Sequence, residues 1–487
     1  MGLGALSTAI EGLNAAQQQI NVISQNIANA STPGYTTKTV ALNSLVLGGS
    51  GAGVSVGQIQ RTMDTTLQNN LLQQTSVSNS SDTAESYLNQ LQQLLGTPDS
   101  NTSISGSLST LKSDFIALDA DPSNGILQTQ VVNDAQNVTS QFNTMSSSVQ
   151  GMRNNAQNDI SSDVSQVNQL LQNIASANLQ IVKANNSNQN TADLADTRDQ
   201  YIQQLSQFMN VATYSNGDGS ITVQTISGGL LADTTAQTLS FSPTPQTAST
   251  YYPASANGIM LNGSDVSGQI TSGSVGQLLN LRDNTLPQVQ AMLDENAHKL
   301  ALRFHAQGVN LFTDASGNVP TNTVANYVGF SGTVQVNPAV IANTADLQNG
   351  TGGATLNSGD NTNITNILNY AFGANSDAAG TPNTPFNTTG LGANANISIN
   401  MPSGGDILGY TSDLVSTLAQ QYSQANSDKT YQDGYYQTLQ KQFQDETGVS
   451  IDAQLSSLIT VQNAYSANAR IITTVSQLFS DLLQTIQ

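Results

Sequence analysis

Apolar residues recur at alternating intervals of three and four positions near both ends of the chain. Close to the N-terminus, the positions that keep this spacing are Leu3, Leu6, Ile10, Leu13, Gln17, Ile20, Ser24 and Ile27. Heptad spacing of this kind lines one face of an amphipathic helix with apolar side chains and is typical of coiled coils. The N-terminal segment is therefore predicted to form a helix that packs against another helix.

The C-terminal segment carries the same spacing. The positions that follow it include Leu455, Leu458, Gln462, Tyr465, Ile472, Phe479 and Leu483. We expect the two terminal helices to pair with each other and to leave apolar surface for further copies of the chain. A lone terminal helix would be marginal, because a buried apolar side chain contributes ~1.5–3 kcal/mol while ordering costs ~1–2 kcal/mol per residue. Both termini are therefore expected to be loose in a free monomer and ordered on assembly.

The first helix is predicted to stop within the stretch NIANASTPGYTT. Pro33 cannot continue a helix, and Pro33-Gly34 fits the central positions of a type II turn, in which Gly supplies the positive φ. Two strands are expected next, TTKTVALNSLVL and GVSVGQIQR, around the connection GGSGAG. From these residues alone, a capped surface helix followed by a hairpin is as good an interpretation as an assembly element.

The residues at 64–209 are predicted to be mainly helical. A heptad runs through 138–156 and resumes one position out of phase through 160–181, which is the mark of a stutter. Residues 131–184 are then one long helix, preceded by a turn at 121–124, where Asp, Pro, Ser and Asn follow one another. Such a helix suits a load-bearing shaft, although an ordinary helical bundle would carry the same pattern.

The remaining segments alternate between strand and helix patterns. Short strands with Gly, Asn, Ser and Thr turns are predicted for 211–275, and the Asn-, Gly- and Thr-rich segment 311–405 is predicted to be β-rich and exposed. The fold class is therefore predicted to be α+β and multidomain, with paired terminal helices in a coiled coil, a long helical-bundle spine and inserted β-rich outer domains. The predicted borders are 1–63 plus 448–487 for a terminal assembly domain with an N-terminal hairpin, 64–210 plus 276–310 plus 406–447 for the spine, and 211–275 and 311–405 for the insertions.

Composition narrows the function classes. The 487 residues include 12 Lys and Arg against 32 Asp and Glu, which gives a net charge of −20. Nucleic acid and anionic membranes are bound by clustered cations, so neither is an expected partner. The chain has no Cys, which excludes disulfides and thiolate chemistry. Its start lacks a basic region and a cleavage motif, so we expect export by a route other than a cleavable signal peptide.

Candidate sites for metal binding are weak. Residues 216–220 and 314–318 have part of the spacing of a calcium loop but lack its closing Glu, so both are predicted to be turns. His298 and His305 lie seven positions apart on a predicted helix, and no third His or Cys exists to complete a zinc site with them. We therefore expect no metal and no cofactor.

Candidate sites for catalysis are equally weak. Asp196, Arg198 and Asp199 lie close together on a predicted helix, where structural ion pairing is a better interpretation than catalysis. No Ser-His-Asp order, phosphate loop or carboxylate dyad is evident, so the protein is not expected to be an enzyme or to have a small-molecule substrate.

Four stretches resemble bacterial flagellar axial proteins. NIANASTPGYTT is similar to the N-terminal signature of rod, hook and hook-associated proteins, and LITVQNAYSANARIITTVSQLFSDLLQTIQ is similar to their closing helix. TADLADTRDQYIQQLSQFMNV and LLNLRDNTLPQVQAMLDENAHKLALRFHAQG resemble the hook-associated protein 1 family, the first hook–filament junction protein. One departure is that residues 451–454 read Ile-Asp-Ala-Gln where the family usually carries an acidic pair, which puts any electrostatic contact made there in doubt.

The resemblance implies a structural subunit outside the cell, in the flagellum, that joins hook to filament after export through the flagellar channel. It implies self-association in a ring, contacts with the hook protein and a second junction protein, and a cytosolic export chaperone on the C-terminal helix. The residues expected at the chaperone contact are Leu458, Tyr465, Ile472 and Phe479. The residues that the resemblance adds to the two apolar stripes at the assembly interface are Asn26, Asn29, Pro33, Gly34, Tyr35, Asn468 and Arg470.

Two other functions stay open. A hook or distal rod subunit of the same family is the nearer one, although such a subunit would pass quickly from the Pro-Gly-Tyr segment into β structure. A surface adhesin with 311–405 as its recognition head is the more distant one, because heptads at both termini are not expected of an adhesin.

Overall fold

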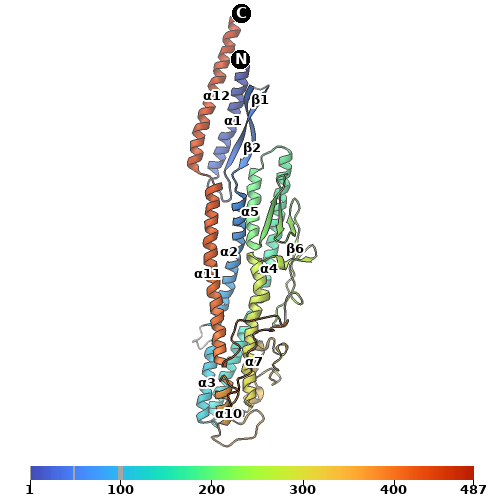
Figure 1. The fold of residues 1–487 in the computed structure, drawn as a ribbon, viewed down its shortest axis with the longest axis vertical. Helices are drawn as coiled ribbons and strands as arrows, with labels where there is room; N and C mark the ends of the chain where they lie inside the picture. The colour runs from blue at the N-terminus through green and yellow to red at the C-terminus, as the bar shows by residue number, and fades with distance from the viewer. Residues whose placement is uncertain (1, 48–49, 97–102, 487) are drawn as a thin grey trace. The chain divides into compact units, whose positions relative to one another are not determined.

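The computed structural model describes residues 2–47, 50–96 and 103–486, and long helices dominate it (Figure 1). The chain forms two compact units. The first comprises Met1–Ser78, Ser165–Leu239 and Gln432–Gln487, and the second comprises Asn79–Val164 and Ser240–Tyr431. The helices α2 (Thr65–Leu95), α4 (Gly125–Asn186) and α11 (Ile407–Thr447) each contribute residues to both units.

In the first unit the two terminal helices run side by side. Figure 1 shows α1 (Gly2–Ala28) next to α12 (Ile451–Ile486), and the antiparallel hairpin of β1 (Lys38–Leu47) and β2 (Ser50–Arg61) lies along α1. The hairpin register begins with Lys38 opposite Arg61 and is interrupted by bulges. The predicted pairing of the terminal helices and the predicted strand pair are confirmed.

The first unit also contains α5 and a small sheet. Helix α5 (Ala192–Phe208) leads into the antiparallel strands β3 (Val211–Ser215), β4 (Ile221–Thr225) and β5 (Leu230–Ala232), which is the predicted change from helix to short strands. Between β3 and β4, the backbone N–H of Asn216 donates to the carbonyl of Ser220 at 2.9 Å. The segment 216–220 is therefore a hairpin turn, as predicted.

Helix α4 confirms the prediction of one long helix. It has 62 residues without a break. The heptad positions on both sides of the stutter are buried: Val138, Phe142, Met145, Val149, Met152, Ala156, Ile160, Val164, Val167, Leu171, Ile174 and Ile181. Before α4, helix α3 (Ile104–Ala120) ends at the predicted turn, and the Asn124 side chain accepts the backbone N–H of Ile126 at 3.0 Å, which caps the start of α4.

In the second unit, α7 (Leu286–Ala306) is almost completely buried. It follows α6 (Gly273–Asn280) through a π-helical turn, Leu281–Thr285, in which the Leu286 N–H donates to the Leu281 carbonyl. Pro287 lacks an N–H and cannot donate to the helical ladder. It directly follows the π-helical turn, and residues 273–306 stay helical throughout. Four aromatic rings from α3, α7 and later segments pack against one another beside α7: Phe115, Phe304, Phe312 and Phe372.

The prediction of β-rich structure in 311–405 is wrong for most of that segment. Its strands β9 (Phe312–Thr313) and β10 (Gln335–Val336) have two residues each. The other regular elements there are the 3₁₀ turns Val324–Asn326 and Phe330–Gly332, the helices α8 (Pro338–Ala342), α9 (Asp346–Asn349) and α10 (Thr362–Asn366), and the π turn Ile367–Ala371. The physical reason is that Asn and Asp side chains bond to nearby backbone N–H groups and so favour turns over strand ladders. Asp314, for example, accepts the N–H groups of Ser316 and Asn318, so 314–318 is a turn as predicted.

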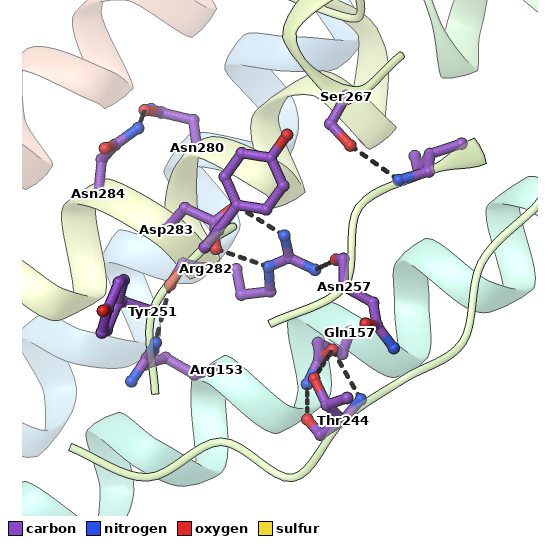
Figure 2. Close-up of polar contacts among 12 residues, drawn as sticks. Arg153, Gln157, Thr244, Tyr251, Asn257, Ser267, Asn280, Arg282, Asp283 and Asn284 are labelled. Atoms are coloured by element: carbon purple, nitrogen blue, oxygen red, sulfur yellow. Dashed lines mark hydrogen bonds and ion pairs between the residues drawn. The ribbon is translucent and has the colours of Figure 1, made fainter. Parts of the chain in front are cut away.

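A long connection in the second unit is fastened by buried arginines (Figure 2). It contains β6 (Leu239–Ser240), β7 (Met260–Leu261), β8 (Ser264–Asp265) and the 3₁₀ turn Ser267–Gln269. The guanidinium of Arg153 on α4 donates to the carbonyls of Thr247 and Thr250 at 2.7 Å each, and that of Arg282 donates to the carbonyl of Asn257 at 2.9 Å. Burial lowers the pKa of Arg153 to about 10. Arginine side chains from helices therefore supply hydrogen bonds to the carbonyls of a connection that has little secondary structure of its own.

Candidate assembly site

The two terminal helices approach each other closely at one glycine. A Cβ added at Gly12 would lie 2.7 Å from Nδ2 of Asn468, which is closer than real Cβ atoms come to other heavy atoms. Asn468 was predicted as an assembly residue from resemblance, and in the single chain it packs against α1. A larger residue at position 12 would force the Asn468 side chain to move.

The buried face of α1 differs from the predicted stripe by one position. Its buried apolar residues are Ala9, Ala15, Ala16, Val22 and Ile23. The predicted positions Leu6, Leu13, Ile20 and Ile27 are only half-buried, and Ile10 is 43% exposed. The cause is that α1 packs against the β1–β2 hairpin as well as against α12. The centre of its buried face therefore lies between these two neighbours and not on the side that faces α12.

Helix α12 is covered along one edge of its predicted stripe. Leu458, Tyr465, Ile472 and Phe479 are half-buried against α1, whereas Leu455 and Gln462 are exposed. Further along, Leu483 is 65% exposed. Other exposed apolar side chains on this helix, which the heptad did not include, are Ile459, Ile471 and Leu478. The α1–α12 pair thus leaves a considerable apolar surface on α12 open in the single chain.

A groove follows the line where α1, β1 and α12 meet. It has a volume of about 350 Å³ and is lined by Val22 and Ile23 of α1, Val40 of β1 and Val461 of α12, together with polar residues.

A buried asparagine ties the end of α1 to the start of α12. The Nδ2 of Asn26 donates to the carbonyl of Lys38 at 2.8 Å and to Oε1 of Gln454 at 3.1 Å. Its Oδ1 accepts the Tyr35 hydroxyl at 3.0 Å and the Lys38 backbone N–H at 3.1 Å. All four hydrogen-bonding positions of the Asn26 amide are therefore used, which gives the Asn and Tyr of the NIANASTPGYTT stretch a structural role.

Beside Asn26, charged residues connect the hairpin to α5. Asp196 accepts the Thr36 hydroxyl at 2.7 Å, and it pairs with Arg61 at 2.9 Å and with the Lys38 ammonium at 3.1 Å. Asp193 pairs with the same ammonium, which also lies 3.6 Å above the Tyr35 ring. Burial opposes the charge of Lys38, but its contacts with Asp193 and Asp196 outweigh burial and raise the pKa of Lys38. The lysine therefore stays protonated and holds β1 on α5.

Asp199 extends the network. It accepts from Arg61 at 2.9 Å and from Arg198 at 3.0 Å, and Arg198 also donates to the carbonyl of Gly219 at 2.9 Å. The predicted interpretation of Asp196, Arg198 and Asp199 as structural ion pairs is confirmed. We call the residues Asn26, Tyr35, Thr36, Lys38, Arg61, Asp193, Asp196, Arg198, Asp199 and Gln454 the polar hub.

The Pro-Gly turn is fixed against α5. Gly34 has φ of +75°, as a type II turn requires, and a Cβ there would lie 2.5 Å from Nε2 of Gln200. The same Nε2 donates to the carbonyl of Pro33 at 3.1 Å. Only glycine meets both requirements at position 34.

Two predicted assembly residues lie apart from the polar hub. The side chain of Asn29 donates to the carbonyl of Gln25 at 3.0 Å within the last turn of α1. Arg470 is exposed on α12.

Of the candidate histidines, His298 is buried and its Nε2 lies 3.0 Å from the carbonyl of Pro320, whereas His305 is exposed at the end of α7. Within residues 2–47, 50–96 and 103–486, no group of three or more His, Cys, Asp or Glu could hold a metal.

The hub residues that sequence reasoning missed are Lys38, Arg61, Thr36, Asp193 and Gln454. A signal for the first two was present, because only 9% of the residues are charged, so an isolated cation is unusual and needs a reason. Gln454 lies in the segment 451–454, where the family usually carries an acidic pair and this chain does not. The contact made there is an amide–amide hydrogen bond instead.

Three models of known families match parts of the chain. The family described as "Flagellar hook-associated protein FlgK helical domain" matches residues 88–319, "Flagella basal body rod protein" matches 6–36, and "Flagellar basal body rod FlgEFG protein C-terminal" matches 440–485. The chain is 29% identical over 326 residues to flagellar hook-associated protein 1 of Salmonella typhimurium, which covers 64% of this chain and 58% of that protein. The protein of the same name from Bacillus subtilis is 22% identical over 519 residues, covering 98% of this chain and 97% of that one. The chain is therefore similar to the flagellar hook-associated protein 1 family along most of its length.

The family regions converge on the polar hub. Asn26 and Tyr35 lie in the rod-protein match, Asp196 and Asp199 in the hook-associated helical domain, and Gln454 in the C-terminal match. Three segments that are far apart in the sequence thus meet in one unit.

A solved structure is also similar. The flagellar hook junction protein FlgK from Burkholderia pseudomallei aligns with a TM-score of 0.42 and 23% identity, covering 52% of this chain and 45% of that one. No helix in the described part of the chain is long and apolar enough to cross a membrane.

Proposed function

We propose that this protein is a structural subunit of the bacterial flagellum that joins the hook to the filament. The observation that carries the proposal is the polar hub, which fixes the α1–α12 pair to the helical body while much of the apolar surface of α12 stays uncovered. A subunit whose terminal helices are held in place, with apolar side chains of α12 still exposed, is suited to packing against copies of itself. The names and coverage of the relatives support the same role.

The proposed partners follow from this surface. Copies of the chain would form a ring in which the open side of α12 packs on the terminal helices of a neighbour, and the hook protein and a second junction protein would flank the ring. Before export, a cytosolic chaperone would cover Leu458, Tyr465, Ile472 and Phe479 together with the exposed apolar residues beside them. Residues 1–63 with 448–487 would act as the assembly domain. The protein would act outside the cell, without catalysis.

The matched helical domain favours this role over a hook or distal rod subunit. It covers residues 88–319, which include the whole of the 62-residue helix α4. In a hook or rod subunit, extended β structure would be expected after the Pro-Gly-Tyr segment. Here a single hairpin follows that segment and leads directly into the 31-residue helix α2.

Electron microscopy of cells that lack the protein tests the junction role. We expect complete hooks without filaments, with flagellin released into the medium, and recovery of filaments when the wild-type chain is supplied. Absence of hooks would indicate a rod or hook subunit instead. Normal filaments would contradict the proposal.

A further inference from the structure

A lysine of the second unit lies in an unusual environment. Lys299 on α7 has a fully buried side chain, and its Nζ lies 2.6 Å from Oδ1 of Asn322, in the loop before the 3₁₀ turn Val324–Asn326. Its only described acidic neighbour is Glu295, one helical turn earlier, at 3.5 Å. Lysine is almost never fully buried in proteins without a specific reason. The loop therefore places a carboxamide against a buried amine.

The carboxylate beside this amine is held in position. Glu295 is fully buried, and it accepts the Tyr327 hydroxyl at 2.5 Å and the backbone N–H of Asn387 at 2.6 Å. The ring of Tyr327 stacks on His298 with centroids 4.1 Å apart, which shields the group from one side. The acid is thus desolvated, fixed and within reach of a proton from Lys299.

The environment favours the reactive form of the amine. Burial lowers the pKa of Lys299, and the nearby Arg303 guanidinium adds to that effect, while Glu295 opposes it. A neutral amine is a nucleophile, and desolvation of lysine is a common way to obtain one near neutral pH.

We propose that Lys299 and Asn322 become joined by an intramolecular isopeptide bond, with Glu295 as the proton carrier. The Nζ lone pair attacks Cγ of Asn322, the Nζ–Cγ bond forms and the Cγ–Nδ2 bond breaks. Glu295 takes a proton from Nζ and delivers it to Nδ2, which leaves as ammonia. An amine and a carboxamide thus become a secondary amide and ammonia, and no oxidant, reductant or second molecule is needed. The exposed position of Asn322 gives ammonia a path to water.

The bond would fix the loop around Asn322, which makes few other contacts with the side chains of α7. Among the described contacts, side chains of α7 hold this loop through His298 at Pro320 and through Lys299 at Asn322. The chain contains no cysteine, so a disulfide cannot fasten it. A covalent link between α7 and the loop restricts the unfolded chain as a disulfide would.

Mass spectrometry of the full-length purified protein tests the proposal. The intact mass, measured after denaturation, is expected to be lower than the sequence mass by one ammonia molecule. Proteolytic digestion is expected to yield a branched peptide that joins Lys299 to Asn322. Separate linear peptides carrying an unmodified Lys299 and Asn322 would overturn the proposal, because the contact would then be an ordinary hydrogen bond.

Two variants at the exposed residue Asn322 act as controls. Asn322→Ala is expected to show its full sequence mass, since no acyl group remains. Asn322→Asp is expected to lose one water molecule instead of ammonia, because the leaving group changes. Persistence of the ammonia loss in Asn322→Ala would place the modification elsewhere, for example at a cyclised asparagine, and would also overturn the proposal.

Discussion

Asp196→Ala is expected to lower the free energy of unfolding of the first unit by about 3–5 kcal/mol. Asp196 is buried and accepts hydrogen bonds from the backbone N–H and hydroxyl of Thr36 as well as from Arg61. Its removal leaves Arg61 and the buried Lys38 with less negative charge around them. Urea denaturation followed by circular dichroism measures the loss.

Asp193→Ala is the matched control. Asp193 pairs with the same Lys38 ammonium, but its side chain is 70% exposed. Exposed ion pairs contribute roughly 0–1 kcal/mol, so a loss of that size is expected. If the two variants lost equal stability, the polar hub would not depend on the buried carboxylate, and our account of how the hairpin is held on α5 would be wrong.

Leu483→Asp is expected to abolish incorporation into the flagellum while changing the stability of the monomer by less than about 0.5 kcal/mol. The Leu483 side chain is exposed in the single chain, so a charge there costs little until a neighbour covers it. Once covered, an unpaired carboxylate is strongly unfavourable. Complementation of a strain that lacks the protein, with electron microscopy of its flagella, measures incorporation.

Two comparisons separate assembly from folding. Ser480→Asp introduces the same charge on α12 at an exposed polar position and is expected to assemble better than Leu483→Asp. Ile472→Asp, and likewise Leu458→Asp, should impair both assembly and packing on α1, because these side chains are already half-buried. Wild-type filaments in cells that carry Leu483→Asp would refute the role of the open face.

Sequence patterns predicted the elements that depend on local periodicity. The heptad and stutter through Val138 and Ile160 predicted helix α4, because a helix needs only its own residues to show which face is buried. The Pro33-Gly34 turn was equally readable, since only Gly tolerates its φ.

Features that depend on distant segments could not be predicted. Which face of α1 is buried depends on the hairpin as well as on α12. The buried residues are therefore Ala9, Ala16 and Ile23 and not the predicted heptad positions. The pairing of Asn26 with Gln454 joins residues from opposite ends of the chain, and no spacing rule connects them. In 311–405, composition distinguishes turn-rich from regular structure but does not show which helix the turns pack against.

Hydrogen exchange tests most directly the central claim that the terminal helices are complete only in the assembly. The rates of the α12 backbone amides beyond residue 470 should be measured in dilute monomer and in isolated hook–filament junctions. We predict rapid exchange in the monomer and strong protection in the junction, with α4 protected in both. Equal and strong protection of α12 in the dilute monomer would contradict the claim.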